Sequence, residues 1–236
     1  AQGNPLGDIP FTLKRGDGYT RSEEKHVAGS GDALVAPVVV NGGLADETSL
    51  NNTAAAYSAI TGSDGTKILT ITRPDTHGTK TSLTATLYSD TTKKATLDTI
   101  FTVVTSPDSD KAKMWGHMPE TVTAADGAVF KRPLLLKELS STSGRTAIAE
   151  DNEDWAQFTQ AQAISTSSNG CGSEYVPSQA GLESLYEANR GNAMKTVQGW
   201  PVASSYLSST TGSSSLEQRD FKAVNLSSGT SSIIPS

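Results

Sequence analysis

The chain has 236 residues, of which 35% are hydrophobic and 19% are charged, and its formal net charge is −6. This acidic balance disfavours nucleic acid and anionic membrane surfaces as partners, because both attract clustered Lys and Arg. No apolar run approaches the roughly 18 residues that a membrane-spanning helix needs, so we expect no direct membrane contact from this part of the protein. Because the chain begins with Ala1 rather than Met, we expect it to be a piece of a longer protein.

Alternating apolar and polar residues predict an all-β fold for residues 11–105. The predicted strands are 34–40, 54–60, 67–72, 83–88 and 97–104. Short alternating strands with Gly, Asn and Asp turns between them favour a sandwich of two sheets. The Cys–Trp–Cys spacing of antibody domains is missing from the sequence, so that class is excluded.

The polar segment 105–110 carries a proline and is predicted to link two domains, 1–107 and 108–236. Beyond this segment, the apolar stretch 112–118 contains Trp115, which is expected to seed a second core. Further extended segments are predicted at 122–130 and 134–139.

An acidic cluster precedes the first predicted helix of the second domain. Its carboxylates are Glu150, Asp151, Glu153 and Asp154. The helix, 155–165, would place Trp155 and Phe158 on one apolar stripe, with the carboxylates near the positive end of its dipole. A calcium site or a catalytic carboxylate pair is the alternative, but the cluster lacks the spaced oxygen ligands and the glycine of an EF-hand loop.

The stretch 171–228 has the most specific pattern. Pro177 and Ser178 stand where a second helix begins, apolar residues follow at three- and four-residue spacing, and Gly191 ends it. Short strands are predicted at 205–210 and 221–226. A helix opened by YVPSQ, a GWP turn, a YLSST strand and an FKAVNLSSG strand together resemble the C-type-lectin-like domain that ends bacterial adhesins of the intimin/invasin family.

The resemblance implies a mostly β protein, with an Ig-like β-sandwich followed by an α+β C-type-lectin-like domain that has two helices. Family members are anchored in the outer membrane of Gram-negative bacteria and carry the lectin-like domain on an Ig-like stalk. We therefore expect this chain at the bacterial cell surface, as an extracellular portion of such an adhesin. The family's tip domains usually pair a cysteine placed like Cys171 with one on the last strand. Here Cys171 is the single cysteine, so either the chain ends before that strand or the thiol is unpaired.

Signatures of metal sites and enzymes are missing from the sequence. Sugar-binding C-type lectins carry Glu-Pro-Asn or Gln-Pro-Asp and Trp-Asn-Asp triplets for calcium, and none occurs here. His26, His77 and His117 are isolated, without zinc-site spacing. Neither a GxSxG motif nor a phosphate-binding loop is found. We predict no metal, no cofactor and no enzymatic activity.

The predicted function is that of a monomeric adhesin tip that binds a host protein, either a cell-surface receptor or a secreted protein such as an immunoglobulin. A calcium-independent glycan-binding module and a structural spacer are the alternatives. The acidic balance would favour a partner with a basic surface. Exposed connections on a rigid scaffold concentrate recognition residues. The candidate partner-binding residues on such connections are Arg190, Asn192, Glu217, Arg219 and Asp220.

Overall fold

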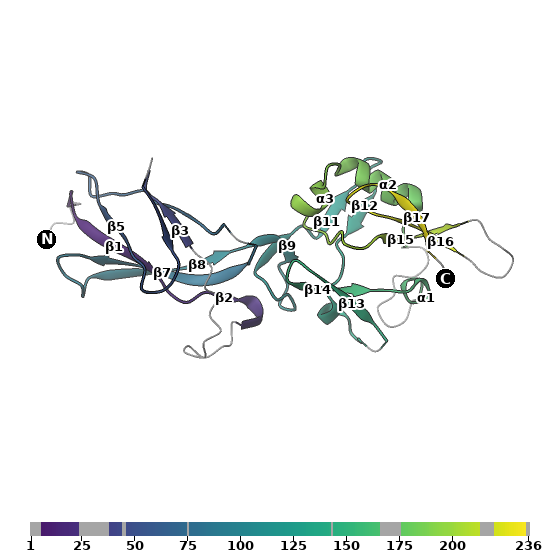
Figure 1. Cartoon of the computed structure of the whole chain (residues 1–236), viewed down its shortest axis with the longest axis horizontal. Helices are drawn as coiled ribbons and strands as arrows, with labels where there is room; N and C mark the ends of the chain where they lie inside the picture. The colour runs from purple at the N-terminus through teal and green to yellow at the C-terminus, as the bar shows by residue number, and fades with distance from the viewer. Residues whose placement is uncertain are drawn as a thin grey trace. The chain divides into compact units, whose positions relative to one another are not determined.

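The computed structural model describes residues 6–23, 38–43, 46–74, 76–142, 144–165, 176–212 and 220–234. The chain divides into two compact units, Ala1–Thr102 and Val103–Ser236 (Figure 1). The division falls between Thr102 and Val103, whereas the sequence placed it after residue 107. The segment 105–107 is not an exposed linker, because it belongs to strand β9 (Val103–Pro107), where Ser106 and Pro107 are buried.

The first unit is a sandwich of a five-stranded and a three-stranded sheet. The larger sheet contains β1 (Pro10–Arg15), β2 (Tyr19–Thr20), β5 (Tyr57–Ile60), β7 (Thr79–Leu87) and β8 (Lys94–Phe101). The smaller sheet contains β3 (Val38–Asn41), β4 (Glu47–Leu50) and β6 (Thr70–Thr72). A 3-10 turn, Arg21–Glu23, follows β2. All strand pairs in these two sheets are antiparallel, and the predicted two-sheet sandwich is confirmed.

The core of the first unit lies between its two sheets. Its buried members are Leu13, Val38, Val40, Leu50, Tyr57 and Leu83. The hydroxyl of Tyr57 donates to Asp46 Oδ2 at 2.5 Å, and Arg15 Nε donates to the carbonyl of Leu50 at 2.8 Å. The strand predicted at 97–104 corresponds to the second half of β8 and the first residues of β9, which are separated at Thr102. Leu97 lies on β8, which pairs with β7 alone among the described strands, and is 66% exposed.

The second unit combines short strand pairs with short helices. Its strands are β9, β10 (Gly116–Met118), β11 (Thr121–Thr123), β12 (Val129–Lys131), β13 (Thr146–Glu150), β14 (Glu153–Gln157), β15 (Tyr206–Thr211), β16 (Phe221–Val224) and β17 (Ser231–Ile234). Its helices are α1 (Gln160–Ala163), α2 (Gln179–Ala188) and α3 (Ala193–Thr196), with a 3-10 turn at Leu136–Glu138. β9 pairs with β10 in parallel, and the pairs β11–β12, β13–β14 and β15–β16–β17 are antiparallel.

Helix α2 forms where the sequence predicts it. The hydroxyl of Ser178 caps it by accepting from the N–H of Gly181 at 3.1 Å. Leu182 and Leu185, three residues apart, are buried and belong to the same core cluster as Val224 and Leu226. Trp155 and Trp200 are also in this core. Trp115, which the sequence predicts to seed it, is half-buried and is not a member of the cluster.

The helix predicted at 155–165 is wrong over most of its length. Residues 153–157 form β14, which pairs with β13, and only Gln160–Ala163 is helical. The reason is the turn between these strands, where Asp151 and Asn152 both have positive φ, at 51° and 66°. Two such residues make the two-residue turn that twists correctly into a hairpin, and Asp and Asn tolerate it. The acidic cluster is therefore a hairpin turn and its flanks, not a helix cap. The segment 134–139 is also not a strand, since its centre is the 3-10 turn.

Strand β17 pairs with β16 along its whole length and contains no cysteine. A strand therefore follows β16 in this chain. Cys171 lies outside the described residues. Within the described ranges, no helix is both long and apolar enough to cross a membrane.

Candidate binding surface

The structure describes three of the five candidate contact residues. Arg190 and Asn192 lie between α2 and α3, at the C-terminal end of α2. Asp220 lies just before β16, and its carbonyl accepts from the N–H of Gly212 at 2.7 Å. The end of β15 contacts the N-terminus of α2, where Thr210 Oγ1 accepts a hydrogen bond from the N–H of Gln179 at 3.0 Å. Ten helical residues span about 15 Å, so Asp220 and Arg190 lie near opposite ends of α2. The structure does not bring them together.

The two remaining candidates, Glu217 and Arg219, lie outside the described residues. They stay predictions.

We call the residues that line the C-terminal end of α2 the α2–α3 corner. It comprises the exposed residues Glu187, Arg190, Thr196 and Val197 and the half-buried Asn192. Arg190 has a side chain that is 68% exposed, and its Nε donates to Glu187 Oε2 at 2.6 Å. Val197 is 59% exposed. An exposed guanidinium held by an ion pair is a group that protein partners use, because Arg contributes disproportionately to interface energies.

The backbone of this corner is shaped by one buried side-chain amide and by two residues with left-handed backbone conformation. Asn189 is 4% exposed; its Nδ2 donates to the carbonyl of Leu185 at 2.9 Å and its Oδ1 accepts from Gln198 Nε2 at 3.0 Å. Gly191 and Asn192 follow with φ of 68° and 69° and turn the chain into α3. The bond between Asn189 and Gln198 ties the residues on either side of the turn together, so the corner is held in place before any partner arrives.

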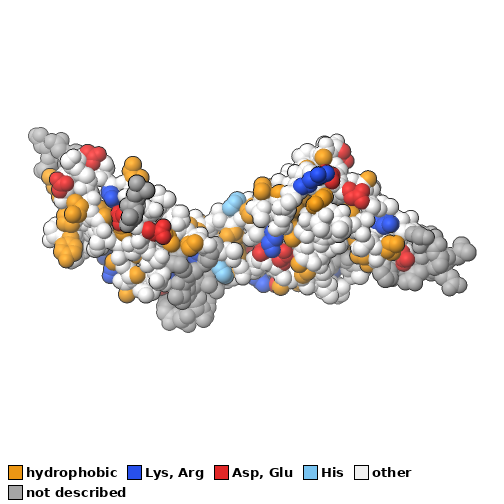
Figure 2. Space-filling view, turned by 45° about the horizontal axis from the view of Figure 1, so that its top comes forward, with side chains coloured by type: hydrophobic (Ala, Val, Ile, Leu, Met, Phe, Trp, Pro, Cys, Tyr) orange, Lys and Arg blue, Asp and Glu red, His pale blue; other side chains and the backbone are white. Residues whose placement is uncertain are grey.

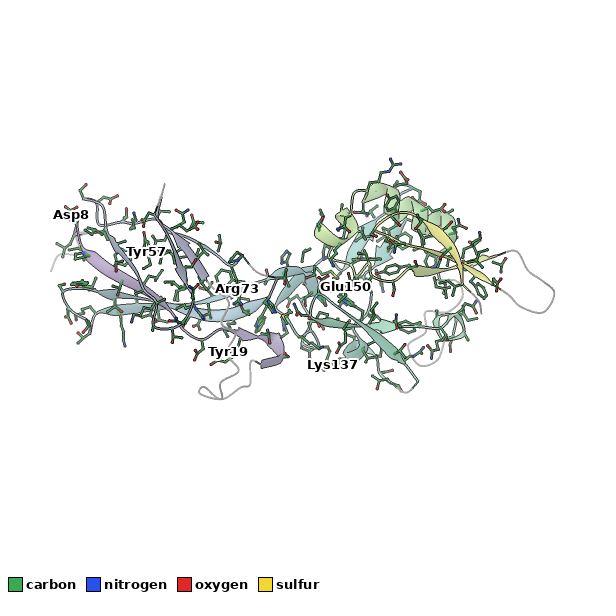
Figure 3. The ribbon with its side chains drawn as sticks, in the orientation of Figure 1. Asp8, Tyr19, Tyr57, Arg73, Lys137 and Glu150 are labelled. Atoms are coloured by element: carbon green, nitrogen blue, oxygen red, sulfur yellow. The ribbon has the colours of Figure 1, made fainter. Side chains whose placement is uncertain are left out.

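Two side chains of helix α3, Met194 and Lys195, attach it to the rest of the unit. Met194 is fully buried, and Lys195 Nζ lies 3.0 Å from Glu150 Oε1 and 3.1 Å from Asp151 Oδ2. The other oxygen of Glu150 accepts from the N–H of Ala203 at 2.9 Å (Figure 3 labels Glu150). Two carboxylates of the acidic cluster thus anchor α3 and the segment after it. The sequence carried no signal for this pairing, because Glu150 and Lys195 are 45 residues apart.

Glu153 has a different role within the same cluster. Glu153 is only 1% exposed. Its carboxylate accepts hydrogen bonds from the N–H groups of Lys113 and Met114, at 2.8 and 2.9 Å, and from Ser106 Oγ at 2.9 Å. Asp154 instead pairs with Lys113 Nζ at 2.7 Å, near the surface. All four carboxylates therefore serve the fold. Within the described ranges, no three His, Cys, Asp or Glu side chains are grouped in a way that could hold a metal ion.

The ion pairs of this unit make its stability depend on pH. Burial raises the pKa of Glu150, but hydrogen bonds from Ala203 and Lys195 outweigh burial and leave that pKa below its ordinary value of 4.5. Burial likewise raises the pKa of Glu138, and hydrogen bonds from Arg132 and the N–H of Leu135 again leave it lowered. The stabilisation from both groups is fully present above 4.5 and is lost as the pH falls through the lower folded values.

We expect the double substitution Glu138→Gln and Glu150→Gln to remove this pH dependence. The free energy of unfolding of the wild type should exceed that of the variant most at neutral pH, and the difference should shrink below the ordinary carboxyl pKa of about 4.5. Urea denaturation at a series of pH values checks this. A difference that stays constant down to about pH 3 would contradict the assignment.

Lys, Arg, Asp and Glu side chains are interspersed on the face of the second unit that Figure 2 shows, rather than gathered in a patch of one sign.

Residues 107–236 match the family model of the InvE-type adhesion domain, described as "Adhesion domain", and residues 1–104 match "Bacterial Immunoglobulin-like 21". The chain belongs to the invasin family of bacterial adhesins. The resemblance in the sequence is thereby confirmed.

Among solved structures, this invasin-family chain is similar to the adhesin InvE of Yersinia pseudotuberculosis. The two are 31% identical, with a TM-score of 0.71 over 97% of this chain. The chain spans 56% of that InvE chain. No curated protein sequence gives a match. The first unit is accordingly the Ig-like domain and the second the adhesion domain, which confirms the predicted mostly β fold class. A role in cell adhesion and display at the bacterial surface follow from the family.

Proposed function

We propose that the adhesion domain is the tip of a Gram-negative outer-membrane adhesin, that it binds a host protein, and that it has no catalytic activity. The Ig-like domain, which is the first unit, serves as the stalk that presents the adhesion domain. The observation that carries the proposal is the match of residues 107–236 to an adhesion domain. A protein partner is favoured over calcium-bound sugar because the sequence has none of the calcium-binding triplets of sugar-binding lectins.

The α2–α3 corner supports the proposal as a preorganised contact surface. Its backbone is fixed by the bond between Asn189 and Gln198, and α3 is fixed by Met194 and Lys195. Binding to such a surface orders few further side chains, so little of the contact energy is lost as conformational entropy. The partner class is either a receptor on a host cell or a secreted host protein such as an immunoglobulin.

Affinity capture tests the function directly. The immobilised chain is exposed to host serum and to solubilised host-cell surface proteins, and retained proteins are identified by mass spectrometry. The isolated Ig-like domain serves as the reference, and a host protein retained by the whole chain alone is the expected result. Retention of glycans in the presence of EDTA, with no protein retained, would overturn the proposal.

With a captured partner in hand, Arg190→Ala is expected to weaken binding about tenfold or more, because exposed Arg residues at ordered surfaces are frequent hot spots. The fold should be unaffected, since the pair with Glu187 is a surface ion pair worth less than about 1 kcal/mol. Surface plasmon resonance measures the change.

Lys111→Ala is the matched control, because Lys111 is another exposed cation of this domain paired with a close neighbour, Asp110. Asp220→Asn tests the opposite end of α2. Equal affinities for Arg190→Ala and the wild type, with a loss for Asp220→Asn, would move the contact surface to that end.

A further inference from the structure

Strand β8 forms one edge of the larger sheet of the Ig-like domain. It pairs with β7 over eight consecutive positions, from Thr86↔Lys94 to Thr79↔Phe101, without a register shift. No other described strand pairs with it. Residues 94–98 are exposed on both faces of the sheet. A long, regular edge without proline or bulge is a template for another strand, because half of its backbone N–H and C=O groups are unpaired.

The hydrogen bonds of β7 show which backbone groups of β8 face outward. The N–H of Leu87 donates to the carbonyl of Lys93, directly opposite, at 3.0 Å. The backbone N–H and C=O groups of residue 93 therefore point toward β7. Because their direction alternates from one residue of a strand to the next, those of residues 95, 97 and 99 also point toward β7. Residues 94, 96, 98 and 100 turn their N–H and C=O groups away from the sheet. The hydroxyls of Thr84 and Thr96, which are 2.9 Å apart, agree with this, because side chains approach most closely at positions without a hydrogen-bonded pair.

The side chains along this edge are complementary to themselves. Lys94 and Asp98 carry opposite charges on the outer face, with Thr96 midway between them. A second copy placed antiparallel, with Thr96 opposite Thr96, sets Lys94 of each chain opposite Asp98 of the other. Charges on edge strands normally oppose pairing, but here each charge meets its opposite, which favours it. The hydrogen-bonding direction permits this register, because residues 94, 96 and 98 all face outward.

The same register also brings apolar side chains together on the inner face of the sheet. Leu97, which is 66% exposed, comes to lie opposite Ala95 of the second copy. Beside Ala95 this face opens into an apolar cleft of about 420 Å³, lined by Phe11, Ala85 and Leu87 among others. Of the two neighbouring registers that the hydrogen bonds also permit, one places Lys94 opposite Thr96, and the other places Lys94 opposite Ile100 and Thr96 opposite Asp98. The register centred on Thr96 is the one that pairs both charges.

We propose that β8 is a self-association edge, through which two copies of this chain join their larger sheets into one continuous antiparallel sheet centred on Thr96. The partner is a second copy of the chain, and the interaction is separate from host-protein binding by the adhesion domain. Such a dimer departs from the monomer expected from the sequence. A single strand pair buries little surface, so the association is weak, with a dissociation constant of about 0.1 mM.

A charge exchange at positions 94 and 98 tests the proposal, with the whole chain followed by sedimentation velocity over a concentration series. The variants are Lys94→Glu, Asp98→Lys and the double exchange. Each single substitution turns two attractive pairs per dimer into repulsive ones and should weaken association about tenfold or more. The double exchange restores both pairs in this register alone, and should recover the affinity of the wild type. Both residues are exposed, so all variants are expected to fold, which thermal melting verifies.

A second substitution tests the backbone. The N–H of Thr96 points away from β7, so Thr96→Pro should keep the sheet and abolish association, as proline is tolerated on the free side of an edge strand. A wild type that remains monomeric at about 1 mM would overturn the proposal. A dimer in which the double exchange is no better than the single substitutions would overturn it as well.

Discussion

Replacing Glu153 by Ala is expected to lower the free energy of unfolding of the adhesion domain by about 3–5 kcal/mol. The carboxylate is buried and accepts from two backbone N–H groups and one hydroxyl, which belong to the loop 112–114 and to β9. Ala would remove the acceptor of the N–H groups of Lys113 and Met114, while the hydroxyl of Ser106 keeps the carbonyl of Met114 at 3.3 Å as an acceptor. Hydrogen bonds to charged groups are the strong ones, and a donor left buried and unpaired incurs its full desolvation penalty.

Asp154→Ala is the matched control, because it removes a carboxylate from the adjacent residue. Asp154 makes one ion pair, with Lys113, and its side chain is 37% exposed. We expect a loss below about 1 kcal/mol for this change. Denaturation followed by tryptophan fluorescence measures both variants in the adhesion domain alone, since its three tryptophans are the only ones in the chain. A loss for Glu153→Ala no larger than for Asp154→Ala would refute the role of Glu153.

The second large effect is expected from Gly199→Ala. Gly199 has φ of +77°, and a Cβ there would lie 1.8 Å from the carbonyl oxygen of Val104 in β9. An alanine thus incurs about 1–2 kcal/mol for the left-handed backbone and must also displace the backbone of β9, for a total of about 3 kcal/mol or more. The displacement would reach the α2–α3 corner, because the N–H of Gly199 donates to the carbonyl of Lys195.

Gly127→Ala separates the two contributions. Gly127 has φ of +88° in the turn between β11 and β12, and nothing lies within 4 Å of a Cβ built there. Only the left-handed backbone is penalised, so a loss of about 1–2 kcal/mol is expected. Tryptophan fluorescence again measures both variants. Equal losses would show that the close approach of Gly199 to β9 adds nothing.

Local signals were sufficient for the elements whose determinants lie close together in the sequence. Ser178 and the spacing of Leu182 and Leu185 predicted α2, and the alternation before and after each turn predicted β15 and β16. The hairpin β13–β14 is not predicted, because the acidic residues around Asp151 also suit the positive end of a helix dipole. The signal that could have identified it is the period of two in TAIAE and EDWAQ on either side of a turn-forming pair.

The candidate surface was located only in part, because its architecture depends on distant partners. Arg190 and Asn192 could be proposed from their place after a predicted helix. That Asn189 binds Gln198, and that Lys195 binds Glu150, follows from tertiary contacts that no local pattern records. The same limit applies to the acidic cluster, whose carboxylates gain their roles from residues far along the chain.

The hairpin turn at Asp151-Asn152 changes how the electrostatic field of this adhesin should be understood. Lys195 lies between Glu150 and Asp151 and offsets one of their two charges, Lys113 offsets the charge of Asp154, and Glu153 is buried. Two of the four negative charges of the cluster are therefore offset within the fold, and the cluster projects less long-range potential than its composition suggests. The attraction that steers a partner toward this domain depends on the exposed side chains of the surface, and the overall charge is a poor guide to it.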